Sequence, residues 1–516
     1  MTARAAQAGI ARGSTDYLVV FVTYLAAASL RAARQGVAAV KPELQSDANF
    51  TATALDAMDT VYLLSLGSVL IVSGAIGKMK GNLSCAIVGL SLSAASMAIT
   101  GILLRAMTPA SVAAATTQVA FAHGPLRAID GFAQALAIPN VVAVASAFVH
   151  PAKMGVVLGA WMTSGPVGDV LAMQLASSFA EDASGGRWTS VYFVVAAAEL
   201  TAALSLYACV DARASPSIRG EDDALLGRGG GGGRGGRGGG GDGFGEALPL
   251  LGGVGVGGGV GVERYASRVK SGWTGAVASI ARDVREAWDI PGLRDWTLSC
   301  AFARTLVLSV LLWMPYYLSK TLGSQVVADN LVNVFAVAIA VGSVLAGQLM
   351  DVLYGRYAPA FACMFVLGAS PLLALPRLEH ATTTFALVLT SLGLFVAGPA
   401  NTFWSGVCVD LAESVNKPRL VSTCVGVVGG VGILGSALGC WIVGRVGSGS
   451  SSVAAAETEE AELDAGEGSA FRDRWDNAFL LMFFVCLKAA LALSRLSYWQ
   501  LRGGMGKPAA TTDSRR

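Results

Sequence analysis

Residues 83–105 read LSCAIVGLSLSAASMAITGILLR, an apolar stretch whose one charged residue is the final Arg105. A helix of about 20 apolar residues spans the hydrocarbon core of a lipid bilayer. Inside lipid, only a helix satisfies every backbone donor and acceptor without closing a barrel. This stretch therefore predicts a transmembrane helix.

The same pattern recurs along the whole chain. Apolar residues make up 53% of the 516 residues and charged residues 14%, whereas about 25% of the residues of soluble domains are charged. We expect an all-α integral membrane protein of about 12 transmembrane helices in two six-helix bundles. The further spans are expected at 17–40, 58–78, 126–149, 154–178, 188–209, 294–318, 328–352, 358–375, 382–409, 419–446 and 475–499.

One apolar stretch is interrupted. Residues 107–125 contain Pro109 and Pro125 together with His123 and Gly124. Proline removes a backbone donor and disturbs a helix. We therefore expect a loop or re-entrant segment at 107–125.

The two bundles are joined by a segment of different composition. We assign residues 1–209 to an N-terminal bundle, 210–292 to a cytoplasmic linker, and 293–516 to a C-terminal bundle with a short tail. Within the linker, 21 of the 35 residues from 227 to 261 are glycine. Such a chain has no means of building a core, so we expect disorder around 227–261 and the role of a tether.

The distribution of basic residues predicts the orientation, because cytoplasmic loops are enriched in Lys and Arg. Both termini are expected in the cytoplasm. The sequon at Asn49-Phe50-Thr51 then lies on the opposite side, which makes Asn49 a candidate for glycosylation. The loops expected on the cytoplasmic side contain Lys78, Lys80, Lys153, Arg356, Lys417 and Arg419.

Charged side chains inside the expected spans carry the functional signal. An arginine at the centre of a bilayer costs at least about 2.5–3.5 kcal/mol, so it usually faces a water-filled path or a partner. Arg304 lies in the middle of its span, and Arg31 and Arg34 share one helix face in the first span. The alternatives are a buried ion pair for Arg304 and an interfacial anchor for Arg31 and Arg34.

Two buried acids are weaker candidates. Asp169 lies within a span and is expected either to pair with an arginine or to relay a proton. Glu199, in the last span of the N-terminal half, is interpreted as structural.

Motifs for covalent chemistry are absent from the sequence. It contains no P-loop, no GxSxG and no HExxH, so we expect neither an enzyme nor a cofactor nor a metal site. The net charge of +2 gives no general attraction for nucleic acid.

Several motifs in order resemble the major facilitator superfamily, and within it the organophosphate:phosphate antiporters of the eukaryotic sugar-phosphate exchanger branch, which includes the glucose-6-phosphate translocase. Arg34 with Lys41 resembles the family's arginine-lysine motif. Gly347, Asp351, Gly355 and Arg356 resemble its conformational loop motif between spans eight and nine. Further matches are Gly131, Gln134 and Pro139 in the fourth span, Pro291-Gly292, Ala303-Arg304 and Trp313 in the seventh, Gly398-Pro399 in the tenth and Gly430 to Gly439 in the eleventh.

The resemblance implies exchange of an organic phosphate, a sugar phosphate or glycerol phosphate, for inorganic phosphate by alternating access. It implies that Arg34 and Arg304 bind the phosphate group, with Arg31 and Ser164 as further binding residues. It also favours a monomer in the endoplasmic reticulum or another endomembrane, with the plasma membrane and the plastid envelope as alternatives. The sequence departs from the family pattern at Gln35, Lys78, Ser164, Ala336 and Gly429, which puts the identity of the anion in question.

Two other functions stay open at this point. One is a proton-coupled organic-anion symporter that uses Asp169 for coupling. The other is a membrane scaffold or sensor without transport activity.

Overall fold

The computed structural model describes residues 15–46, 50, 52–106, 112–180, 187–211, 275–322, 325–353, 355–375, 381–448 and 467–502. Among these residues, eleven helices are long and apolar enough to cross a membrane, and a shorter apolar helix, Ala358–Ala374, coincides with the remaining expected span. The prediction of an all-α membrane protein is confirmed. The Gly-rich stretch 227–261 and Asn49 lie outside the described residues.

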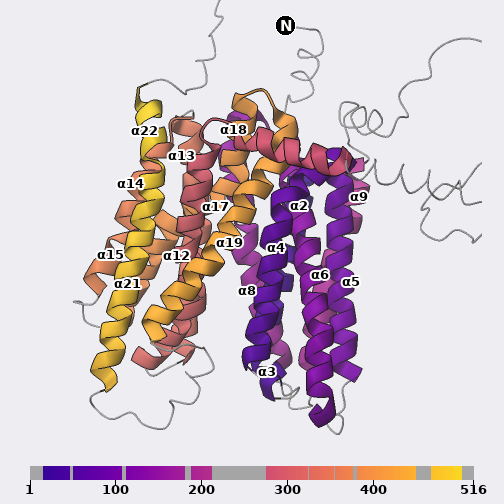
Figure 1. The fold of residues 1–516 in the computed structure, drawn as a ribbon, viewed down its shortest axis with the longest axis vertical. Helices are drawn as coiled ribbons and strands as arrows, with labels where there is room; N and C mark the ends of the chain where they lie inside the picture. The colour runs from indigo at the N-terminus through magenta and orange to yellow at the C-terminus, as the bar shows by residue number, and fades with distance from the viewer. Residues whose placement is uncertain are drawn as a thin grey trace, which may run out of the picture.

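The N-terminal bundle consists of long helices with short connections (Figure 1). Its elements are α2 (Tyr17–Ala39), α3 (Lys41–Ser46), α4 (Ala52–Lys80), α5 (Asn82–Ala106), α6 (Val112–Ala147), η2 (Pro151–Lys153), α7 (Met154–Trp161), α8 (Ser164–Ala180), η3 (Arg187–Thr189) and α9 (Ser190–Asp211).

The C-terminal bundle follows a helix over residues 275–288. Its elements are α12 (Leu293–Leu322), α13 (Gln325–Leu353), α14 (Ala358–Ala369), α15 (Pro371–Ala374), α16 (Thr382–Leu392), η5 (Gly393–Ala397), α17 (Gly398–Thr402), η6 (Phe403–Val407), α18 (Cys408–Ser414), η7 (Pro418–Leu420), α19 (Val421–Ser448), α21 (Glu467–Ala492) and α22 (Ser494–Leu501).

The sequence prediction of a loop at 107–125 is wrong for residues 112–125. Helix α6 begins at Val112 and continues through Pro125 and Pro139. In membrane helices proline is tolerated because neighbouring helices and local adjustments satisfy the backbone groups that it leaves free. Residues 107–111 lie outside the described part of the chain.

The two bundles meet at one end of the molecule and diverge toward the other (Figure 1). We call the first the linker end, because the helix over residues 275–288 lies there. At the linker end α4 packs on α19, and the hydroxyl of Ser422 donates to the carbonyl oxygen of Gly74 at 2.9 Å. A second contact at this end is that of α7 with α13, where Gly155 and Gly347 approach so closely that a methyl group on either would overlap the backbone of the other.

Asp351 fixes the contact between α7 and α13. Its two carboxylate oxygens accept hydrogen bonds from the backbone N–H groups of Gly155 and Val156, at 2.8 and 2.7 Å. These N–H groups belong to the first turn of α7 and have no partner within the helix. The carboxylate also interacts favourably with the positive end of the helix dipole. A side chain of the C-terminal bundle thus caps a helix of the N-terminal bundle.

Two further residues of the loop motif lie just beyond α13. Gly355 has a φ of +82°, which only glycine adopts without strain and which turns the chain into α14. Arg356 is exposed beside it.

The helix over residues 275–288 joins the two bundles by ion pairs. The Lys78 ammonium, at the end of α4, lies 2.5 Å from the carboxylate of Asp283, which is 6% exposed. On the C-terminal side, Glu286 lies 2.8 Å from Lys417 and 3.1 Å from Arg419. The hydrogen bond with Lys417 lowers the pKa of Glu286, so this contact is retained until the pH falls below the ordinary range of a glutamate.

We predict that Lys78→Glu weakens the closure at the linker end, because it places a second carboxylate against the buried Asp283. Alkylation of a cysteine introduced by Ser422→Cys, followed by peptide mass spectrometry, measures the closure. In the Ser422→Cys background, the rate of alkylation should rise several-fold when Lys78→Glu is added. It should return toward the original value when Lys78→Glu and Asp283→Lys are combined.

The exposed Cys363 serves as the internal standard for reagent reactivity in that experiment. Equal alkylation of the introduced cysteine with and without Lys78→Glu would show that the ion pair does not hold the bundles together.

Candidate substrate-binding site

Arg304 projects from the middle of α12, the first helix of the C-terminal bundle. Its guanidinium carbon lies 3.7 Å from the centre of the Trp404 ring, a cation–π contact. Trp404 belongs to the π-helical turn η6, and such turns recur at functional sites. Among the described residues Arg304 makes no ion pair and no hydrogen bond. Its charge is therefore available to a ligand.

Arg31 and Arg34 project from α2, the first helix of the N-terminal bundle. Arg31 pairs with Asp169 of α8, with 2.5 Å between Nη2 and Oδ2. Arg34 has no ion pair or hydrogen bond in the part of the chain that the structure describes. Of the two, Arg34 is the one without an ion pair, although Asp169 and Asp59 act on it electrostatically.

The three arginines belong to one electrostatic environment. Arg304 experiences repulsion from both Arg31 and Arg34, although it comes from the other bundle. Two of the buried N–H donors that lack a hydrogen-bond partner within the described residues belong to this site: Nε of Arg31 and the indole Nε1 of Trp404. An orphaned buried donor costs about 1–3 kcal/mol. The two carboxylates near these cations are each paired, Asp169 with Arg31 and Asp59 with Lys41, so the set of arginines and unpaired donors suits an anion.

The structure places Ser164 at the start of α8, 3% exposed, next to Gly165, which packs on the Arg31 side chain. It therefore lies close to Arg31 in space, but no hydrogen bond joins it to the arginines among the described residues. The residues of the loop motif lie at the linker end. Gly347 and Asp351 are near the end of α13, and Gly355 and Arg356 follow just beyond it. They do not join the three arginines in the candidate site.

Two departures from the family pattern have a physical explanation. Gly429 faces the Trp404 ring, and a Cβ at this position would lie 3.0 Å from its Cε3 atom. Glycine thus leaves room for the ring beneath Arg304. Lys78 has its partner in Asp283. For Gln35 and Ala336 nothing in the structure explains the departure.

Trp404 is absent from the residues predicted from the sequence. It lies near the end of the expected span 382–409, and tryptophan is common near the ends of membrane helices, so its position did not single it out.

Comparison with known proteins agrees with this architecture. Residues 20–326 match the Major Facilitator Superfamily, so the chain belongs to this family of membrane transporters. It is a multi-pass integral membrane protein and a transporter rather than an enzyme.

Proteins of similar sequence indicate a branch within this family. The human protein named sugar phosphate exchanger 3 is 25% identical over 399 residues, which cover 76% of this chain and 74% of that protein. The Arabidopsis thaliana protein named putative glycerol-3-phosphate transporter 3 is 26% identical over 334 residues, or 62% of this chain and 58% of that protein. These names fit the organophosphate:phosphate antiporter branch.

Solved structures agree in fold. The proton:xylose symporter XylE, bound to 6-bromo-6-deoxy-D-glucose, superimposes with a TM-score of 0.60 at 13% identity, covering 93% of this chain and 95% of that chain. A bacterial homologue of the iron transporter ferroportin in an outward-facing state also gives 0.60, at 11% identity, covering 93% and 99%.

Proposed function

We propose that this transporter exchanges an organic phosphate, such as a sugar phosphate or glycerol phosphate, for inorganic phosphate. The single observation that carries the proposal is that two guanidinium groups, Arg34 and Arg304, one from each bundle, make no ion pair among the described residues. Guanidinium presents a planar fork of donors that matches phosphate oxygens two at a time. The names of the similar proteins support the same class of substrate.

The orphaned donors extend the proposed site beyond the phosphate. Trp404 presents an indole N–H. A sugar or glycerol moiety offers hydroxyl oxygens as acceptors for that N–H. Arg31, with its Nε unpaired, and the neighbouring Ser164 offer further donors on the opposite bundle.

Exchange follows from the charge of the site. Without an anion, Arg34 and Arg304 repel each other across the interface between the bundles. A bound dianion cancels both charges, so the loaded transporter passes more easily through the occluded state than the empty one. Rocking of one bundle over the other then alternates access, and it requires the linker-end contacts of Asp351 and Asp283 to open.

The proposal includes the arrangement of the chain. We propose that one chain acts as a monomer, with bundles at 1–209 and 293–516 joined by a linker at 210–292. The ion pair between Arg31 and Asp169 supports a neutralising role for Asp169, rather than the proton relay of a symporter.

Arg304→Gln is expected to abolish exchange. Loss of one of two charges that hold an anion costs about 2–5 kcal/mol of binding, because the remaining charge no longer balances a dianion. The assay is uptake of labelled phosphate into proteoliposomes loaded with phosphate, and Arg304→Lys, which keeps the charge but loses the fork, should retain a reduced rate.

Membrane level and detergent stability should be unchanged in Arg304→Gln, which separates a binding defect from misfolding. For the unaltered protein, uptake should require internal phosphate. Equal uptake into empty vesicles would argue against exchange, and full activity of Arg304→Gln would return Arg304 to a packing role.

We further propose that the linker end faces the cytoplasm, and that the protein resides in the endoplasmic reticulum or another endomembrane. Lys78, Lys153, Lys417 and Arg419 gather at this end, in agreement with the enrichment of basic residues on the cytoplasmic side.

In sealed vesicles of known orientation, a protease on the cytoplasmic side should cleave within residues 227–261. Asn49 should be modified by a glycosyltransferase on the other side. Cleavage of the linker from the side on which Asn49 is modified would contradict this orientation.

A further inference from the structure

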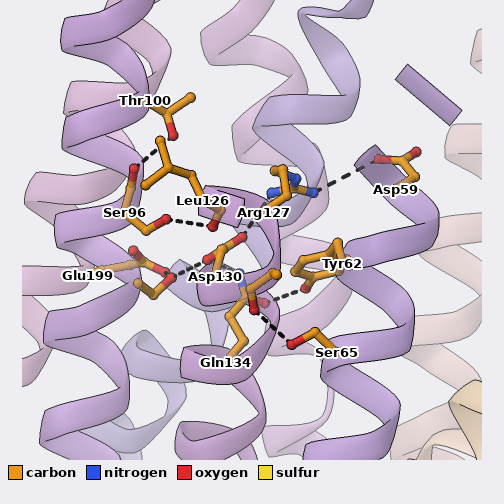
Figure 2. Close-up of polar contacts among 12 residues, drawn as sticks. Asp59, Tyr62, Ser65, Ser96, Thr100, Leu126, Arg127, Asp130, Gln134 and Glu199 are labelled. Atoms are coloured by element: carbon orange, nitrogen blue, oxygen red, sulfur yellow. Dashed lines mark hydrogen bonds and ion pairs between the residues drawn. The ribbon is translucent and has the colours of Figure 1, made fainter. Parts of the chain in front are cut away.

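A second polar cluster lies within the N-terminal bundle and takes no part in the proposed phosphate site. It consists of Arg127 and Asp130 on α6, Ser93 on α5 and Glu199 on α9 (Figure 2). Arg127 is 3% exposed and the other three are fully buried. Figure 2 shows the Glu199 carboxyl group directed into the cluster from the helix opposite Asp130.

The hydrogen bonds of the cluster converge on one hydroxyl group. The Oγ atom of Ser93 lies 2.7 Å from Oδ1 of Asp130 and 2.8 Å from Oε1 of Glu199. A serine hydroxyl carries one hydrogen and donates only one strong hydrogen bond. Two ionised carboxylates are acceptors only, so they cannot both bond to Ser93 at these distances. One of the two acids must supply a proton of its own.

The surroundings decide which acid carries it. Asp130 accepts from the Arg127 guanidinium at 2.8 Å and from the Gln134 amide at 3.2 Å, so its negative charge is balanced. Within the described residues Glu199 has no ion pair, and its Oε2 atom is buried without a hydrogen-bond partner. A protonated Glu199 donates to Ser93, and Ser93 donates to the Asp130 carboxylate.

No other cation is free to replace the proton. On the helices around the cluster, the other ionisable side chains that the structure describes are Tyr17, Tyr24, Arg31 and Arg34 on α2, Asp59, Tyr62, Lys78 and Lys80 on α4, Cys85 and Arg105 on α5, His123 on α6, Asp169 on α8, and Tyr192, Tyr207 and Cys209 on α9. None of them is hydrogen-bonded or ion-paired to Glu199 in the part of the chain that the structure describes. Arg31 is engaged by Asp169, and Lys78 by Asp283.

We propose that Glu199, Ser93, Asp130 and Arg127 form a proton-binding site, with the proton on Glu199, and that release of this proton makes a step of the transport cycle depend on pH. Release breaks the bond between oxygen and hydrogen at Glu199, and the proton passes to water. Ser93 then bonds to only one of two anions, which loosens α9 from α5 and α6. No electron transfer is involved.

The site is connected to α4, a helix at the interface between the two bundles. Gln134, which donates to Asp130, accepts a hydrogen bond from the Tyr62 hydroxyl at 2.7 Å. The Arg127 guanidinium lies 4.4 Å from the centre of the Tyr62 ring. Tyr62 belongs to α4, which packs on α19 of the C-terminal bundle. A negative charge that appears at Glu199 therefore acts on a polar network that extends to the interface between the bundles.

Infrared spectroscopy of the purified full chain tests for the proton directly, because a protonated carboxyl group absorbs apart from an ionised one. A shift from neutral to alkaline pH should remove a carboxylic-acid band. The band should be missing in Glu199→Gln, which keeps the shape and offers an amide N–H to Ser93. It should persist in Asp169→Asn, the matched control, since Asp169 pairs with Arg31 and takes no part in the cluster.

Identical difference spectra for the unaltered protein and Glu199→Gln would overturn the proposal. Ser93→Ala provides a second variant that leaves both acids in place. It should shift the pH midpoint at which the band disappears, and an unchanged midpoint would mean that Ser93 does not link the two acids.

A transport assay tests the coupling between the proton-binding site and transport. It measures the rate of labelled phosphate exchange as a function of pH. The unaltered protein should show a change of rate across the pH range in which the infrared band titrates, whereas Glu199→Gln should show a flat profile. A retained pH profile in Glu199→Gln would refute the coupling. The infrared arm needs no phosphate transport, so failure of the proposed exchange function and failure of the proton-binding site give different results.

Discussion

Two guanidinium groups inside this membrane protein make no ion pair, and this is the constraint on which the proposed transport cycle depends. Arg34 and Arg304 come from the first helix of each bundle, and neither has an ion pair among the described residues. Each costs at least about 2.5–3.5 kcal/mol at the bilayer centre on insertion scales. Other buried cations of the N-terminal bundle are paired, Arg31 with Asp169 and Arg127 with Asp130. Two arginines without an ion pair, one from each bundle, support our proposal that a transported anion balances their charge.

The linker end is held closed by contacts between charged groups of the two bundles. At the linker end charges are satisfied across the interface: Asp351 caps the first turn of α7, and Lys78 meets Asp283. Each of these contacts joins the two bundles and breaks when they separate. We therefore regard the linker end as a closed gate. Opening it costs the free energy of these contacts, and we propose that anion binding offsets this cost.

The sequence was sufficient for the fold because length and apolar composition predict membrane helices with few alternatives. The prediction of a loop was wrong at 112–125, because proline was assumed to interrupt a membrane helix as it interrupts a helix of a soluble protein. It proposed the arginines correctly as charged groups inside spans, but whether each is paired could not be predicted. The pairs Arg31–Asp169 and Lys78–Asp283 join residues 138 and 205 positions apart, and no periodicity relates them. Trp404 and the shared hydroxyl of Ser93 became visible only with the side chains in place.

A double-mutant cycle of phosphate binding tests the central claim most directly. Calorimetric titration of inorganic phosphate into the purified protein would compare Arg34→Gln, Arg304→Gln and the double variant. If both groups hold one anion, each single variant should lose nearly as much affinity as the double variant, which gives a large coupling between the two sites. Additive losses, or a loss in one single variant alone, would contradict a site shared by the two bundles.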